Sequence, residues 1–238
     1  STVPPSVTLS RHAAAKAPTL AQLLELLKRD DVLGVGEGFW QEVLRGERNF
    51  PALSAEARAL GKTSEGHAAG CRGQRLAAYL NYGVSSCHES VSAEDVVERL
   101  RFGISTMIRE GSIRKELEAI AKIKDLGLDL RRAVLVTDGA DPRDLVGKGY
   151  LDHVVQRAID AGFDPVLAVQ MASLNVAEHF RLDGVLGGIA PAKYADMVLI
   201  PDLRTIKAEV VISNGVVIAQ DGELLVEPRP AVFTGSEL

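Results

Sequence analysis

Short apolar runs alternate along this chain with helix-like segments, and this alternation most limits the folds open to it. Five runs are typical of strands, and the second of them is weak and placed mostly by its position: 32–37, 61–67, 83–88, 104–109 and 133–138. Strands that alternate with helices indicate parallel β/α units. The sequence therefore predicts an α/β fold built on a parallel sheet.

The segments around these runs carry helix signals. Thr19 can cap a helix with a face of leucines, and Ser92 can cap a helix over 93–101. Other helices are expected from Ser112 to about Asp125, from Tyr150 to Ala161, from Pro165 to about Ser173 and from Asn175 to Phe180. The pattern changes after about Gly188, where a strand over 195–200 precedes a hairpin over 210–219. The turn Asn214-Gly215 favours that hairpin. We therefore expect residues 1–187 to form the β/α part and residues 188–238 a small β-domain.

Ionisable residues stand where four of the five runs end. They are Glu37, His67, His88 and Asp138, and the fifth run ends in Arg109-Glu110. Such residues are costly at the end of an apolar strand unless they are used, and ligands meet the carboxyl ends of parallel strands. Two imidazoles and two carboxylates suit Zn, Fe, Mn or Co. A metal there lowers the pKa of bound water to about 7, and Glu89 is the candidate for moving protons.

Structural interpretations compete with this one. A single histidine at a strand end is more often structural. His67 and His88 together, each after an apolar run, favour a functional site instead. Strand alternation points Cys87 away from the face of His88, and it lets Glu89 face the site only if the strand ends at His88. The turn 109–112 is either a strand-to-helix connection capped by Ser112 or a turn that binds an anion or substrate. The remaining histidines, His12, His153 and His179, are expected to have no role in the site.

Composition excludes several functional classes. The chain has 238 residues and a formal net charge of −5, which gives no electrostatic reason to expect nucleic acid. No apolar run reaches the 18 or so residues that span a bilayer, so no membrane association is expected. The two cysteines, Cys71 and Cys87, imply no disulfide framework, and a reducing cytoplasm is the default.

These motifs resemble the adenine deaminases of the amidohydrolase superfamily. Gly36-Glu37 is similar to the family's fourth-strand G-E motif, Gly66-His67 to its fifth-strand D-G-H motif, and His88-Glu89 to its sixth-strand D-H-E motif. Further segments match R-E-G-S, the eighth-strand T-D and N-x-A-E-H-F, namely 109–112, 137–138 and 175–180.

The resemblance implies part of a metal-dependent (β/α)8 TIM barrel with part of a small C-terminal β-domain. It implies a hydrolase with a binuclear divalent centre of Mn, Fe or Zn, whose hydroxide converts adenine to hypoxanthine and ammonia. In that picture Glu37, His67, His88 and Asp138 are metal ligands. Asp138 also activates the water, and Glu89 passes protons to the ring. We expect Arg109, Glu110 and Ser112 to bind the purine-like substrate.

The chain departs from the family pattern beside the ligands. Glu65 and Cys87 replace two aspartates, Gly139 replaces another, and Gly38-Phe39-Trp40 replaces M-M-N. The substrate is therefore less firmly indicated than the metal chemistry, and another aminopurine or another cyclic amidine or amide is the alternative.

The family's first-strand His-x-His pair is absent from these 238 residues. Counting back from Glu37, Ser1 falls near the end of the family's third strand. We expect another chain or a lost fragment to supply the pair and complete the barrel, and we expect a homo-oligomer. The rival hypothesis is a catalytically inactive half-barrel that serves as a binding or structural subunit.

Overall fold

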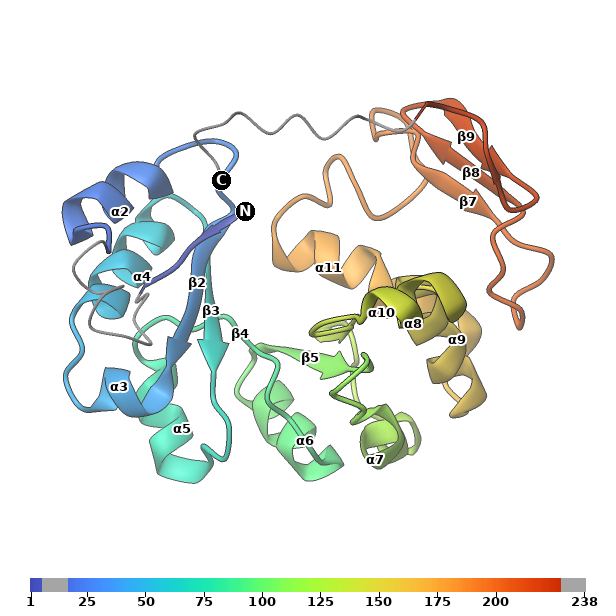
Figure 1. Cartoon of the computed structure of the whole chain (residues 1–238). Helices are drawn as coiled ribbons and strands as arrows, with labels where there is room; N and C mark the ends of the chain where they lie inside the picture. The colour runs from blue at the N-terminus through green and yellow to red at the C-terminus, as the bar shows by residue number, and fades with distance from the viewer. Residues whose placement is uncertain (6–16, 228–238) are drawn as a thin grey trace.

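The computed structural model describes residues 1–5 and 17–227, which form three sheets and the helices that cover them (Figure 1). Two sheets are parallel, with strand orders β1-β2-β3 and β4-β5-β6, and the third is antiparallel, with order β10-β9-β8-β7. The strands are β1 (Thr2–Val3), β2 (Gly34–Phe39), β3 (Thr63–His67), β4 (Ser86–Cys87), β5 (Ser105–Arg109), β6 (Ala133–Val136), β7 (Met197–Leu199), β8 (Val210–Ser213), β9 (Val216–Gln220) and β10 (Glu223–Leu224). The predicted α/β class with parallel strands is confirmed.

Helices connect the consecutive parallel strands from β1 to β6, as β/α units require, and four more helices follow β6. They are α2 (Leu20–Leu27), α3 (Trp40–Leu44), α4 (Asn49–Ala59), α5 (Gly73–Leu80), α6 (Ala93–Arg101), α7 (Leu117–Ile120) with the 3-10 turn Ala121–Asp125, α8 (Pro142–Gly147), α9 (Leu151–Asp160), α10 (Pro165–Ala172) and α11 (Leu174–His179). Two predicted caps are confirmed. Thr19 and Gln22 form a capping box at α2, and the Ser92 hydroxyl accepts the backbone N–H of Asp95 at α6.

The two parallel sheets meet at β3 and β4. The backbone N–H of Ser85 donates to the carbonyl of Ser64 at 2.8 Å, and the Ser85 hydroxyl donates to the same carbonyl at 2.7 Å. One apolar core surrounds β1–β3 with α2, α4 and α5, and a second packs β5 and β6 against α6, α7, α9 and α10. The six strands β1 to β6 therefore form one row in chain order (Figure 1). Because they are parallel, the segments that follow β2, β3, β4 and β6 all lie at the same end of this row.

The helix predicted from Ser112 is wrong in its first turn, because residues 110–116 form a bridged turn instead. Glu110 and Lys115 make an isolated antiparallel bridge, and the backbone N–H of Glu116 returns to the carbonyl of Arg109 at 3.0 Å. A Cβ at Gly111 would collide with the Thr137 carbonyl oxygen, so this turn packs tightly on the end of β6. Regular helix begins only at Leu117.

Strand limits also differ from the sequence prediction. β2 continues to Phe39, two residues beyond Glu37, whereas β4 is confined to Ser86–Cys87 and stops before His88. In the C-terminal sheet, Asn214 and Gly215 both have positive φ, 49° and 79°, so the predicted hairpin is confirmed between β8 and β9.

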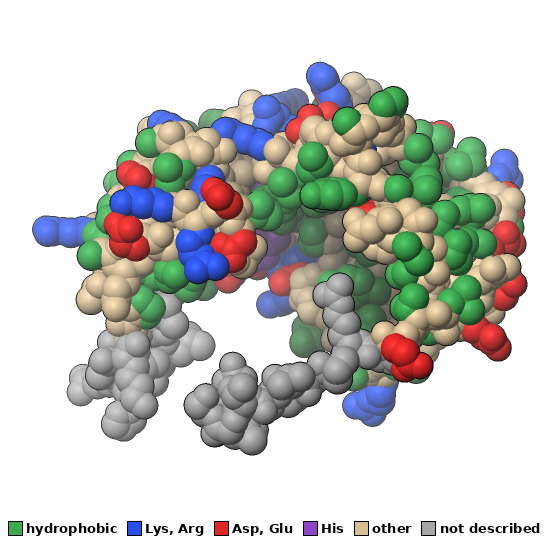
Figure 2. Space-filling view, turned by 90° about the horizontal axis from the view of Figure 1, so that it is seen from above, with side chains coloured by type: hydrophobic (Ala, Val, Ile, Leu, Met, Phe, Trp, Pro, Cys, Tyr) green, Lys and Arg blue, Asp and Glu red, His purple; other side chains and the backbone are tan. Residues whose placement is uncertain are grey.

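Helix α11 closes the end of the strand row opposite to the ligand-bearing ends. The amide of Asn175 donates to the carbonyls of Leu130 and Ala133 at 3.0 and 2.8 Å, which fixes α11 against β6. Seen from this end, the molecule is hollowed in the middle (Figure 2). A cavity of about 690 Å³ is lined by the first residues of β3 and β5 together with α4 and α11.

Within residues 1–5 and 17–227, β1 and β6 each pair with a strand on one side only. The parallel strands therefore end in two open edges. In the same residues, no helix is both long and apolar enough to cross a membrane.

Arg99 links two β/α units and generates a stability prediction. Its side chain is 0% exposed, donates to the carbonyls of Asp95 at 3.1 Å and Ala68 at 2.9 Å, and lies 3.6 Å from the Asp95 carboxylate. Removing one partner of a buried ion pair typically costs about 3–5 kcal/mol.

We expect Arg99→Met to lower the free energy of unfolding by about 3 kcal/mol, measured by urea denaturation. Arg101→Met, on an exposed position of the same helix, should cost under about 1 kcal/mol, and equal losses would contradict the assignment.

Candidate metal centre

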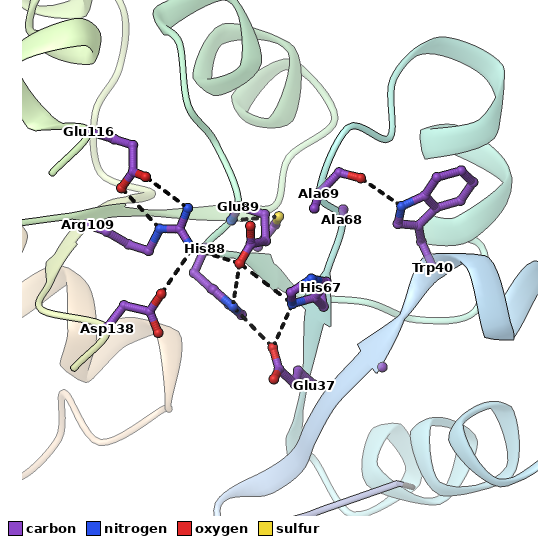
Figure 3. A network of polar contacts seen from close by, with 12 residues as sticks. Glu37, Trp40, His67, Ala68, Ala69, His88, Glu89, Arg109, Glu116 and Asp138 are labelled. Atoms are coloured by element: carbon purple, nitrogen blue, oxygen red, sulfur yellow. Dashed lines mark hydrogen bonds and ion pairs between the residues drawn. The ribbon is translucent and has the colours of Figure 1, made fainter. Parts of the chain in front are cut away.

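Glu37, His67 and His88 converge at one end of the parallel strands (Figure 3). Glu37 Oε2 lies 3.1 Å from His67 Nδ1 and 3.1 Å from His88 Nε2. His67 is the last residue of β3 and His88 directly follows β4. These side chains therefore meet because neighbouring parallel strands end beside one another.

A second group of possible ligands shares His88 with the first. His88, Glu89 and Asp138 each offer a donor atom, and these atoms lie within 4.8 Å of one another. Glu89 Oε1 is 3.2 Å from His88 Nε2 and 3.6 Å from His67 Nδ1. Because β4 stops at Cys87, the chain turns at His88, and Glu89 faces the same space as the two imidazoles.

Arg109 lies beneath these carboxylates and is 1% exposed. Its Nη1 donates to Glu89 Oε1 at 2.7 Å and to Asp138 Oδ2 at 2.9 Å, while Nε and Nη2 each contact Glu116 at 3.2 Å (Figure 3). Burial opposes the charge of Arg109, but the charges of Glu89 and Glu116 and the contact with Asp138 raise its pKa. The guanidinium thus fixes two carboxylates from different strands in one geometry.

Glu110 and Ser112, the other residues expected to bind substrate, have their polar partners outside this group. Glu110 is buried, 3.6 Å from Arg157 Nε. The Ser112 hydroxyl accepts the backbone N–H of Asp141 at 2.7 Å. Both line a small cavity of about 30 Å³. Their assignment to substrate, like that of Arg109, stays a prediction.

The electrostatics of the group favour a bound cation. Hydrogen bonds from His67 and then His88 lower the pKa of Glu37. Burial would lower the pKa of His88, but Glu37, Glu89 and Asp138 together raise it. Each imidazole nitrogen carries at most one proton, yet Glu37 Oε2 and Glu89 Oε1 both face it. A divalent cation beside Glu37 Oε2 would satisfy both imidazole nitrogens at once, and imidazole with carboxylate is a donor set that suits Zn, Fe or Mn.

The histidines and cysteine expected to have no role in the site differ in their surroundings, and that expectation stays a prediction. His179 Nε2 is 3.0 Å from both Glu65 oxygens, so it is a satisfied buried histidine. His153 lies within α9, and His12 falls outside the described residues. Cys87 is fully buried in the core, and its sulfur accepts the backbone N–H of Glu89 at 3.3 Å.

Sequence reasoning missed two features of the centre. It did not assign Glu116, which neutralises Arg109, because nothing in the sequence marks a carboxylate seven residues away as its partner. It also stopped the strand at Glu37 and so left Phe39 out of the site. The signal for Phe39 was the aromatic pair Phe39-Trp40 directly after a candidate ligand.

The sequence matches the amidohydrolase family over residues 75–225. It is 42% identical over 207 residues to the adenine deaminase of Moorella thermoacetica, a match that covers 84% of this chain and 34% of that protein. The chain thus spans about a third of the length of the curated relatives it matches.

Solved structures of low sequence identity share the fold. A β-aspartyl dipeptidase from Fervidobacterium islandicum AW-1 superposes with a TM-score of 0.65 at 19% identity, covering 94% of this chain and 65% of that one. An adenosine deaminase from Xanthomonas campestris with bound zinc gives a TM-score of 0.56 at 15% identity, covering 88% and 57%. The family match, the shared fold and the likeness to adenine deaminases agree with the motifs at the strand ends, and the chain belongs to the amidohydrolase family.

Proposed function

We propose that this chain carries the greater part of the active site of an adenine deaminase, which hydrolyses adenine to hypoxanthine and ammonia. The observation that carries the proposal is the convergence of two imidazoles and two carboxylates at neighbouring strand ends. The likeness to adenine deaminases supports the choice of substrate. A cytoplasmic location belongs to the same proposal.

Glu37, His67 and His88 would hold one divalent metal, and the carboxylate of Asp138 would contribute to a second. Zinc, manganese or iron fits these donors. A metal at this position supplies chemistry that the side chains lack, because it lowers the pKa of a bound water and so provides hydroxide at neutral pH.

The side chains divide the proton transfers between them. Asp138 Oδ2 is held by Arg109, which leaves Oδ1 to accept a proton from the attacking water. Glu89 Oε1 is held by Arg109 and faces the imidazoles. Its Oε2 has no hydrogen bond to the described part of the chain, and we assign to that atom the transfer of one proton from water to the purine ring. The proton that Asp138 accepts would then leave with the amine as ammonia.

The barrel itself extends beyond this chain in the same proposal. Residues 1–187 would form part of a (β/α)8 barrel, and residues 188–238 would belong to a small β-domain. The open edges at β1 and β6 support this, because strand edges in closed barrels are paired. A segment with a His-x-His pair would fill the gap and add ligands, and homo-oligomerisation remains a prediction.

Removing either imidazole tests the ligand assignment. We expect His67→Asn and His88→Asn to lose bound metal and ammonia release together, because each removes a donor 3.1 Å from Glu37. Metal content by atomic emission and ammonia release from adenine check this. His153→Asn, in α9, should keep its metal. Full metal content in both test variants would show that the imidazoles are structural.

Glu89→Gln tests the proton-transfer role. It keeps the size of the side chain but cannot carry a proton between water and ring, and such groups typically contribute about 10²–10⁴-fold to the rate. We expect kcat for ammonia release to fall in that range while metal content stays at the wild-type level. Glu118→Gln, exposed in α7, is the matched control and should be fully active. Metal loss in Glu89→Gln would make Glu89 a ligand rather than a proton carrier.

Supplying the proposed missing segment tests the barrel hypothesis. We expect co-purification with the N-terminal part of an adenine deaminase to raise the metal content per chain, because a His-x-His pair adds two donors. Ammonia release should appear in the same preparation. If the complex forms and binds metal but releases ammonia neither from adenine nor from related aminopurines, the chain is a non-catalytic subunit or acts on another cyclic amidine or amide.

A further inference from the structure

Phe39 lies at the rim of the candidate centre with its ring partly open to solvent. It is 40% exposed, and its ring centroid is 4.4 Å from that of His67, with the planes tilted by 41°. A single exposed phenylalanine is ordinary on a protein surface. Phe39 differs from such a residue because its ring lies against a proposed metal ligand.

A β-bulge turns Phe39 toward the centre. Val35 pairs with Ser64, and Gly38 pairs with Gly66. Between these two pairs β2 advances by three residues while β3 advances by two, so β2 contains one extra residue. The extra residue reverses the alternation of side chains, and Phe39 comes to lie directly opposite His67. Paired residues of neighbouring parallel strands point to the same face, so Phe39 and His67 share the face that carries the metal donors.

The residues on either side of Phe39 hold the backbone in place. A Cβ at Gly38 would collide with the Phe50 ring, and the Gly38 carbonyl accepts the Tyr79 hydroxyl. Trp40 Nε1 donates to the carbonyl of Ala69 at 2.9 Å (Figure 3). Because both neighbours are anchored, the backbone of Phe39 is held opposite that of His67.

We propose that Phe39 forms a stacking wall for the substrate, which selects planar aromatic heterocycles. This rests on the proposed deaminase function. A purine placed with its polar edge toward the imidazoles and carboxylates presents a flat π-face, and the open ring of Phe39 offers an apolar partner at the rim. Saturated cyclic amides lack that face and gain nothing from the wall.

The test compares three variants in the metal-loaded full protein. Phe39→Ala removes the ring, Phe39→Tyr keeps it, and Phe102→Ala removes a phenylalanine of similar exposure, 44%, at the end of α6. We expect Phe39→Ala to lower kcat/KM for adenine about 5- to 150-fold, the range that aromatic–base stacking covers. The loss should lie mainly in KM, and metal content should be unchanged. Phe39→Tyr and Phe102→Ala should stay within about two-fold of wild type, well below the effect of losing a stacked base.

Two further readouts distinguish a stacking wall from a ring that only supports His67. Equilibrium dialysis with adenine measures binding without turnover, so a wild-type protein that binds adenine but releases no ammonia overturns the deaminase function and leaves the stacking test intact. Metal loss in Phe39→Ala would show that the ring merely positions His67, and it would overturn the proposal. Unchanged adenine affinity in Phe39→Ala, or no adenine binding by the wild type, would overturn it as well.

Discussion

The arrangement of the centre depends on one buried cation, the guanidinium of Arg109. It draws Glu89, Asp138 and Glu116 together from three consecutive β/α units. A buried charge is retained only when its partners are complete, because each unpaired ion costs several kcal/mol. Arg109 therefore sets the positions of the two proposed proton carriers before any ligand arrives. This preorganisation is what electrostatic catalysis requires of a site.

The positive charge of Arg109 does not balance the negative charge of the carboxylates in the centre. Four carboxylates, from Glu37, Glu89, Glu116 and Asp138, gather around one guanidinium and two imidazoles. Glu116 is neutralised by its two contacts with Arg109, but Glu37 has only imidazole partners. The charge balance therefore favours a divalent cation beside Glu37, at the place where the imidazole nitrogens also point.

The sequence predicted the parts of the site that follow from strand ends, and missed those that depend on packing. Glu37, His67 and His88 could be found because ligands gather where parallel strands stop. The bulge in β2 could not, since it is set by pairing with β3 rather than by any local pattern. The false helix start at Ser112 has the same origin. The Ser112 hydroxyl accepts the backbone N–H of Asp141 instead of capping a helix, and the contact of Gly111 with the end of β6 imposes a turn there.

The residues that depart from the adenine deaminase pattern differ in what they imply, because their side chains have different surroundings. Cys87 packs in the apolar core, where its sulfur accepts the backbone N–H of Glu89, and it belongs to neither group of possible metal ligands. Glu65 meets the imidazole of His179, and Gly139 has a φ of 103° that strongly favours glycine. These changes leave the metal donors as they are. Phe39 alone of these departures lies against a proposed ligand, and we therefore expect this chain to differ from its relatives in how it holds the ring rather than in how it activates water.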